Sequence, residues 1–65
     1  MDRLERDIQR IRSRLMREGW TVIPSRGPHE KFRHPERSDA VIIPRGRGDL
    51  PTGTARSIAR AAGWT

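Results

Sequence analysis

The chain has 65 residues and a formal net charge of +6 at pH 7, and nearly all of its positive charge comes from arginine. A chain of this length forms one small domain with a thin core, and the lack of cysteine excludes a disulfide framework and thiolate metal sites. Because so basic a surface attracts polyanions, nucleic acid is the leading class of partner, although an acidic protein would satisfy the same charge.

Metal and membrane functions find little support in the residues. Two histidines and scattered acidic residues do not form a convincing zinc set, so we expect neither a metal nor another cofactor. No apolar run approaches the roughly 20 residues that a membrane span needs, and the N-terminus is too polar for a signal peptide. We therefore expect a cytoplasmic protein that does not engage a membrane.

The first predicted element is a helix over residues 2–18 that ends at Gly19. Its apolar residues recur at steps of four and three and so share one narrow stripe: Leu4, Ile8, Ile11 and Leu15. A separate arc is basic: Arg3, Arg6, Arg10, Arg14 and Arg17. This arc is either a solvated face or a surface for phosphates or an acidic partner. The coiled-coil spacing of the apolar stripe also leaves open a homo-oligomer through this helix.

Three short strands and a second helix follow. Aromatic and β-branched residues predict strands over residues 20–23, 29–34 and 40–43, and the short turns between them favour an antiparallel meander. The second helix is predicted over residues 53–62, with Thr52 as its N-cap and Gly63 after its end. The predicted fold class is therefore α+β, in the order α-β-β-β-α, with two helices on one face of a three-stranded antiparallel sheet.

The second strand carries the sharpest functional signal. Because successive side chains on a strand point to opposite faces, His29, Lys31 and Arg33 share one face, and Phe32 lies on the other. Phe32 is the only large apolar residue of this strand, so its face should pack against the helices. The histidine and both cations should then project outward together. A neutral imidazole accepts a proton near cellular pH, and flanking cations stabilise an anion that forms beside it.

This combination suits the cleavage of RNA without a metal. RNA carries its own nucleophile, the 2′-hydroxyl, and a base that removes its proton starts attack on the adjacent phosphate. In this hypothesis His29 is the general base, and Lys31, Arg33 or both brace the negative charge on phosphorus. The alternative for His29 is a surface histidine beside a turn. His34 falls on the opposite face of the strand, so we expect a partly buried, hydrogen-bonded imidazole there.

Further phosphate contacts are predicted after the third strand. The loop Arg45-Gly46-Arg47-Gly48 combines a flexible backbone with two forked cations. At the start of the next helix, Thr52 and Thr54 supply hydroxyls beside free backbone N–H groups, which suits an anion. Arg56 and Arg60 extend this basic surface or simply solvate it. The alternative to a binding site is an ordinary capped helix after an exposed loop.

Several segments, in order from Gly19 to Gly63, resemble the HicA toxin family. They are Gly19-Trp20, Gly27-Pro28-His29-Glu30-Lys31-Phe32-Arg33-His34-Pro35, Val41-Ile42-Ile43-Pro44-Arg45, Leu50-Pro51-Thr52-Gly53-Thr54-Ala55-Arg56-Ser57-Ile58 and Ala62-Gly63. The resemblance implies a double-stranded-RNA-binding-domain-like fold and a toxin of a type II toxin–antitoxin module. It also implies cleavage of mRNA and a HicB-type antitoxin that binds and blocks the toxin. The family's catalytic histidine lies in a Gly-Ser-His motif at the start of the second strand, and His29 matches it.

The sequence departs from the family at two places. Pro28 stands where the family usually has serine, which removes a hydroxyl and fixes the turn more rigidly. The N-terminal helix is also longer and richer in arginine than is usual there. The residues alone leave two other functions open: a non-catalytic RNA-binding module on the same fold, and a DNA-binding or small ribosomal-type protein. Few aromatic stacking residues and no evident pair of recognition helices disfavour the second of these.

Overall fold

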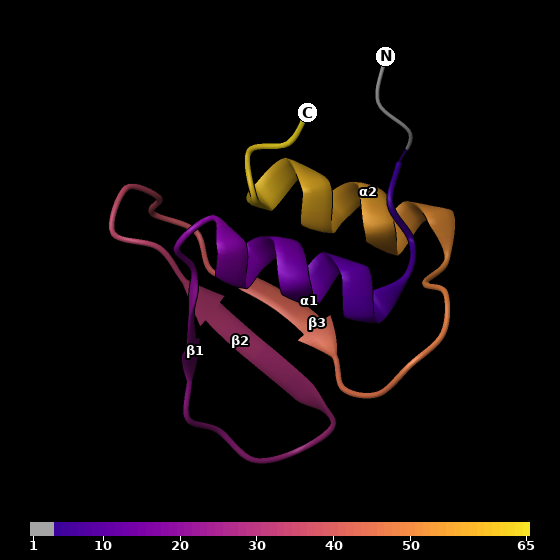
Figure 1. Ribbon diagram of the computed structural model, residues 1–65, viewed down its shortest axis with the longest axis horizontal. Coiled ribbons are helices and arrows are strands. Elements are labelled where there is room, and N and C mark those ends of the chain that lie inside the picture. Colours follow the sequence, from indigo (N-terminus) through magenta and orange to yellow (C-terminus); the bar gives the residue numbers. More distant parts are fainter. Residues whose placement is uncertain (1–3) are drawn as a thin grey trace.

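The computed structural model describes residues 4–65, and its elements follow the order helix, three strands, helix (Figure 1). They are α1 (Ile8–Arg17), β1 (Thr21–Ile23), β2 (His29–Arg33), β3 (Val41–Pro44) and α2 (Thr52–Ala61). The strands form one antiparallel sheet in the order β1-β2-β3, which confirms the predicted meander and fold class. Within residues 4–65, no helix has the length and apolar character needed to cross a membrane.

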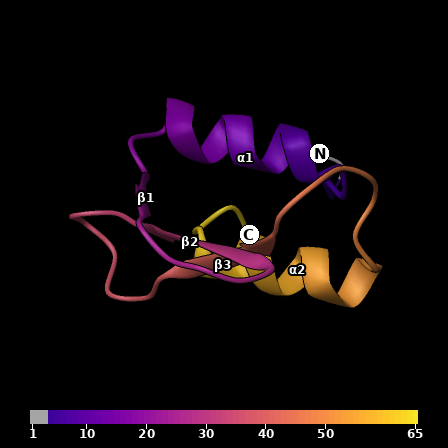
Figure 2. The ribbon, with the colours of Figure 1, turned by 90° about the horizontal axis from the view of Figure 1, so that it is seen from below.

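One core joins both helices to one face of the sheet. Figures 1 and 2 show α1 and α2 running in the same direction, so that both helices end on the same side of the molecule. Their apolar sides meet the inward side chains of β2 and β3, in a cluster of Ile8, Ile11, Leu15, Trp20, Phe32, Val41, Ile43, Leu50, Ala55, Ile58 and Ala62. The predicted apolar stripe of α1 is thus buried within the domain, which accounts for its spacing without a second copy of the chain.

Helix α1 begins at Ile8, so the predicted helix over residues 2–18 is wrong for residues 4–7, and its first two residues lie outside the described part of the chain. Asp7 is the N-cap, because its carboxylate accepts a hydrogen bond of 3.0 Å from the backbone N–H of Arg10. Arg6 pairs instead with the loop before α2: the Leu50 N–H donates to the carbonyl oxygen of Arg6 at 2.8 Å. Helical periodicity does not reveal such a pairing, because the partner lies far along the chain.

This later start also shortens the predicted arginine arc. Arg10, Arg14 and Arg17 lie on α1, whereas Arg6 precedes the helix and Arg3 lies outside the described residues. The side chain of Arg6 donates through Nε to the carbonyl oxygen of Leu50 at 2.7 Å, and so it belongs to the contact between the N-terminal segment and the loop.

Both helices end in the same Gly-Trp pair. Gly19 and Gly63 have φ values of 96° and 81°, which a residue with a side chain rarely adopts. The following tryptophans close the last turns: Trp20 N–H donates to Leu15 O at 3.0 Å, and Trp64 N–H to Ala59 O at 2.7 Å. Both predicted helix stops are therefore confirmed.

The boundaries of the other elements differ slightly from the predictions. Thr52 is the first residue of α2 rather than its N-cap, and no side chain caps this helix. Pro51 takes the N-cap position, since its carbonyl oxygen accepts the Ala55 N–H at 3.0 Å. Trp20 and His34 lie just outside β1 and β2, and β3 runs from Val41 to Pro44.

Candidate active site

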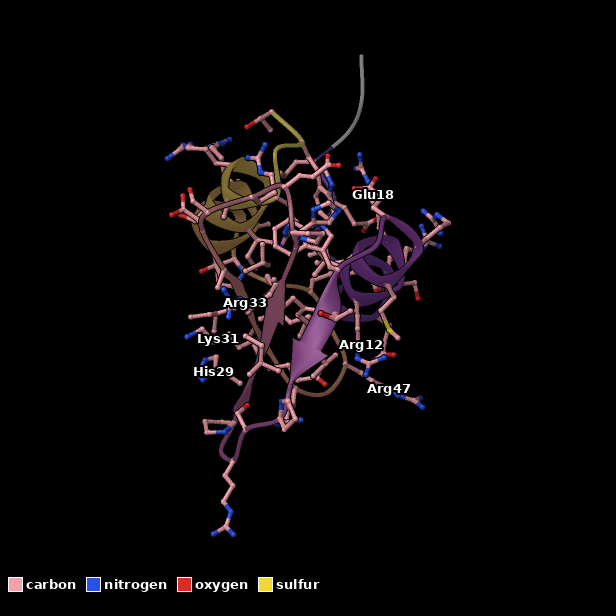
Figure 3. The ribbon with its side chains drawn as sticks, turned by 90° about the vertical axis from the view of Figure 1, so that its left-hand side faces the viewer. Arg12, Glu18, His29, Lys31, Arg33 and Arg47 are labelled. Carbon is pink, nitrogen blue, oxygen red and sulfur yellow. The ribbon has the colours of Figure 1, made fainter. Side chains whose placement is uncertain are left out.

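The face of the sheet that turns away from the helices carries a row of basic side chains. Along β2, Glu30 and Phe32 are buried, whereas His29, Lys31 and Arg33 are exposed. Figure 3 shows these three exposed side chains projecting on one side of the sheet. The predicted alternation of β2 is therefore confirmed, and the histidine and both cations face solvent together.

An apolar flank accompanies this basic row. Lys31 pairs across the sheet with Ile23 on β1 and with Ile42 on β3, and Ile42 is 53% exposed. Beside Lys31 and Arg33 the surface is hollowed by about 340 Å³, in a depression lined by Ile23, Lys31, Arg33, Arg37, Ser38, Asp39 and Ala40. Since three of these side chains are cations and one is a carboxylate, the depression favours an anionic ligand. Sequence reasoning missed Arg37, whose only signal was its charge in a polar turn.

The two histidines have different surroundings. The ring of His29 is exposed, and it makes no hydrogen bond with any residue between 4 and 65. The ring of His34 accepts at Nδ1 from the Glu36 N–H at 3.1 Å, so the proton lies on Nε2, which donates to the Glu18 carbonyl oxygen at 3.1 Å. This confirms the predicted structural role of His34. Residues 4–65 bring no three histidine, aspartate or glutamate side chains together as metal ligands.

A buried carboxylate lies behind the basic row. Glu30 is 8% exposed and accepts a hydrogen bond of 2.9 Å from Arg12 Nε, with Arg45 Nη1 3.5 Å away. The Arg12 hydrogen bond lowers the pKa of Glu30, burial opposes this, and the charges of Arg12 and Arg45 lower it further. Sequence reasoning missed this group. The available signal was a carboxylate at a core-facing position, which requires a cation.

Arg45 connects this carboxylate to the turn before His29. Its Nε donates to Gly27 O at 2.8 Å and its Nη2 to Ser25 O at 3.1 Å, while its backbone N–H donates to Pro28 O at 2.9 Å. The guanidinium predicted to contact RNA thus holds the backbone of residues 25–28, although the side chain stays 42% exposed. Arg45 therefore fixes the position from which His29 enters β2.

The structure does not bring the other predicted phosphate contacts to His29. Figure 3 shows Arg47 on the opposite side of the sheet from His29. Thr52 and Thr54 are exposed in the first turn of α2. Figure 1 shows this helix above the sheet, whereas β2 starts at the lower end of the sheet. Arg56 borders a groove between the two helices.

The fold and this site together define a class: a small basic α-β-β-β-α domain with a free histidine and a row of cations on its open sheet face. Residues 8–64, which contain all five elements, match the family described as the HicA toxin of bacterial toxin–antitoxin systems. The chain belongs to the HicA toxin family, and membership implies an antitoxin partner. A comparison with curated proteins finds no relative that matches the chain significantly.

Proposed function

We propose that this HicA-family toxin is a metal-independent endoribonuclease that cleaves mRNA, with His29 as its general base. One observation carries the proposal: His29 is exposed on the same sheet face as Lys31 and Arg33. The other histidine, His34, has both ring nitrogens engaged in hydrogen bonds. Family membership supports the same activity, because a toxin must damage a cellular component and RNA is the polyanion that supplies its own nucleophile.

The proposed reaction begins at the 2′-hydroxyl of the nucleotide before the cut. An imidazole nitrogen of His29 takes the hydroxyl proton, and the oxygen attacks the adjacent phosphorus. The bond to the 5′-oxygen of the next nucleotide breaks, and that oxygen takes a proton from water. The products are a 2′,3′-cyclic phosphate and a 5′-hydroxyl end. Lys31 and Arg33 stabilise the extra negative charge on the phosphorus oxygens, and a positioned base contributes about 10²–10⁴-fold in rate.

The partner implied by the family is proposed to be a HicB-type antitoxin, which neutralises the toxin. Family membership is the support for this assignment. The exposed basic row of β2 and its apolar neighbour Ile42 offer a surface that a protein or an RNA can cover, and an inhibitor that covers this surface would exclude the substrate.

The substitution His29→Ala tests the catalytic assignment. Labelled RNA is incubated in EDTA with the parent and the variant, and cleavage by the variant is expected to be slower by about 10²–10⁴-fold. Since the ring of His29 is exposed, the unfolding midpoint of the His29→Ala variant should equal that of the parent. His34→Ala is the matched histidine control, which should lose stability but keep its cleavage rate per folded molecule.

Two results would count against the proposal. A His29→Ala variant that cuts RNA at the parent rate removes His29 from the reaction. RNA that stays intact at high concentrations of the parent protein would favour the other candidate, a non-catalytic RNA-binding module.

A further inference from the structure

A second surface, on the helices, has the composition of a site for single-stranded RNA. We propose that the groove between α1 and α2 binds a stretch of the RNA chain away from the cut, through Arg14, Arg56, Arg60 and Trp64. The inference rests on the proposed function in one respect, namely that the substrate is RNA. The groove itself lies outside the site on the open sheet face.

The groove is lined by both apolar and basic side chains. Its volume is about 290 Å³, and its apolar lining includes Ala59 and Trp64. The lining holds Arg14 from α1 with Arg56 and Arg60 from α2; Glu5 is its acidic side chain, and Glu18 pairs with Arg14. Arg56 and Arg60 are exposed, one helical turn apart, and form no ion pair within the part of the chain that the structure describes. This charge excess complements a polyanion.

The aromatic part of the groove is already ordered. The Arg14 guanidinium carbon lies 4.1 Å from the centroid of the Trp64 ring. Glu18 holds both groups, because it accepts from Arg14 Nε at 2.8 Å and from the indole Nε1 at 2.7 Å. The helix-ending hydrogen bond of Trp64 fixes the backbone beneath the ring. A ligand that stacks here therefore loses little further side-chain freedom on binding.

This stack favours a nucleic acid over an acidic peptide. Unpaired bases stack on aromatic rings and on guanidinium planes, while nearby arginines bind the backbone phosphates. An acidic peptide could pair with the arginines, but its carboxylates would gain nothing from the stacked Arg14 guanidinium and Trp64 ring. Because the molecule measures 18 Å even in its shortest direction, an RNA that occupies both the groove and the open sheet face must be longer than a few nucleotides.

The binding test uses RNA oligomers of about twenty nucleotides with 2′-O-methyl groups, which lack the nucleophile and therefore report binding without cleavage. Affinity is measured by fluorescence anisotropy over a range of salt concentrations. For Arg56→Ala/Arg60→Ala, we expect the slope of log affinity against log salt to become shallower by about 1.4, since each phosphate contact to a single strand contributes about 0.7. The affinity at low salt should fall at least tenfold.

The matched control is Arg10→Ala/Arg17→Ala. These arginines are exposed on α1 but do not line the groove, so this variant loses the same charge from the helical side. Its salt slope should stay close to that of the parent. If the control weakens binding as much as Arg56→Ala/Arg60→Ala does, the helices contribute only general charge and the proposal fails.

Tryptophan emission supplies a second measurement. Trp20 is only 4% exposed, so quenching by a bound oligonucleotide should come from Trp64 and disappear in Trp64→Phe. A glutamate-rich peptide that quenches this emission when polyuridylate does not would assign the groove to a protein partner and overturn the proposal. Neither measurement depends on catalysis, so failure of the His29 assignment would leave this test unaffected.

Discussion

Glu30→Gln is expected to destabilise the protein while keeping the shape of the side chain. The substitution removes the charge that Arg12 and Arg45 contact at 2.9 and 3.5 Å. A hydrogen bond to a charged group contributes about 1.5–3 kcal/mol. The side chains of Arg12 and Arg45 are 36% and 42% exposed, so both regain water, and the expected loss is about 2 kcal/mol. For a domain of this size, that loss lowers the melting temperature by about 8–16 °C.

The same substitution should change how stability depends on pH. The hydrogen bond from Arg12 lowers the pKa of Glu30 in the folded protein, although burial opposes it. A carboxyl with a lowered pKa contributes stability above its unfolded pKa, about 4.3, and that contribution is lost as the pH falls through the folded pKa. The parent should therefore lose stability below about pH 4.3, and Glu30→Gln should lose less. Part of the slope remains, because Arg14 also lowers the pKa of Glu18.

Urea unfolding followed by circular dichroism measures both effects. Glu36→Gln, at an exposed turn, removes the same charge and should change the free energy of unfolding by no more than about 0.5 kcal/mol. Glu30→Gln could match the parent both in its free energy of unfolding at neutral pH and in the loss of that free energy at acidic pH. The ion pairs of Glu30 with Arg12 and Arg45 would then contribute nothing to stability, contrary to this prediction.

Three further substitutions test the backbone around the site and in and after α2. Arg45→Gln should lower kcat for RNA cleavage by about ten- to a hundredfold with little change in KM, because the turn before His29 loses its clamp; an equal rise in KM would instead indicate an RNA contact. Gly63→Ala should cost roughly 1–2 kcal/mol in urea unfolding, since φ is 81° and the new Cβ would lie 2.7 Å from Arg37 Nη1. In Gly53→Ala the new Cβ meets no atom within 4 Å, and the substitution should stabilise α2 by about 0.5 kcal/mol. If both substitutions changed the free energy of unfolding in the same direction, this argument would be contradicted.

The features that local periodicity controls could be predicted from the sequence. The alternation of β2 identified Phe32 as the inward residue and placed His29 with Lys31 and Arg33 on the open face. The same alternation separated His34 from His29. Glycine marked both helix ends, because only glycine adopts a positive φ readily.

Features that depend on distant segments could not be predicted in this way. Leu4 continues the four-residue spacing of α1, yet residues 4–7 are not helical, and the backbone at residues 6–8 bonds instead to the loop at residues 48–50. The side chain of Arg45 bonds to Gly27 and Ser25, which lie 18 and 20 positions earlier in the chain. Both acceptors are backbone carbonyl oxygens, which no side-chain pattern identifies. The groove likewise depends on how α1 and α2 lie against the same core, which neither helix pattern shows by itself.

The arginines illustrate the same limit, since identical residues perform two physically different tasks. One group donates to acceptors in distant segments of the chain and supports a thin core: Arg6, Arg12 and Arg45. Among the cations whose side chains make no hydrogen bond or ion pair within residues 4–65, a second group borders the two proposed RNA sites: Lys31, Arg33, Arg56 and Arg60. This second group gathers on the open sheet face and around the helical groove. Removing a cation of the first group should therefore affect unfolding before RNA binding, and removing one of the second should do the reverse, because a guanidinium that already donates to its own chain has fewer N–H groups free for a phosphate.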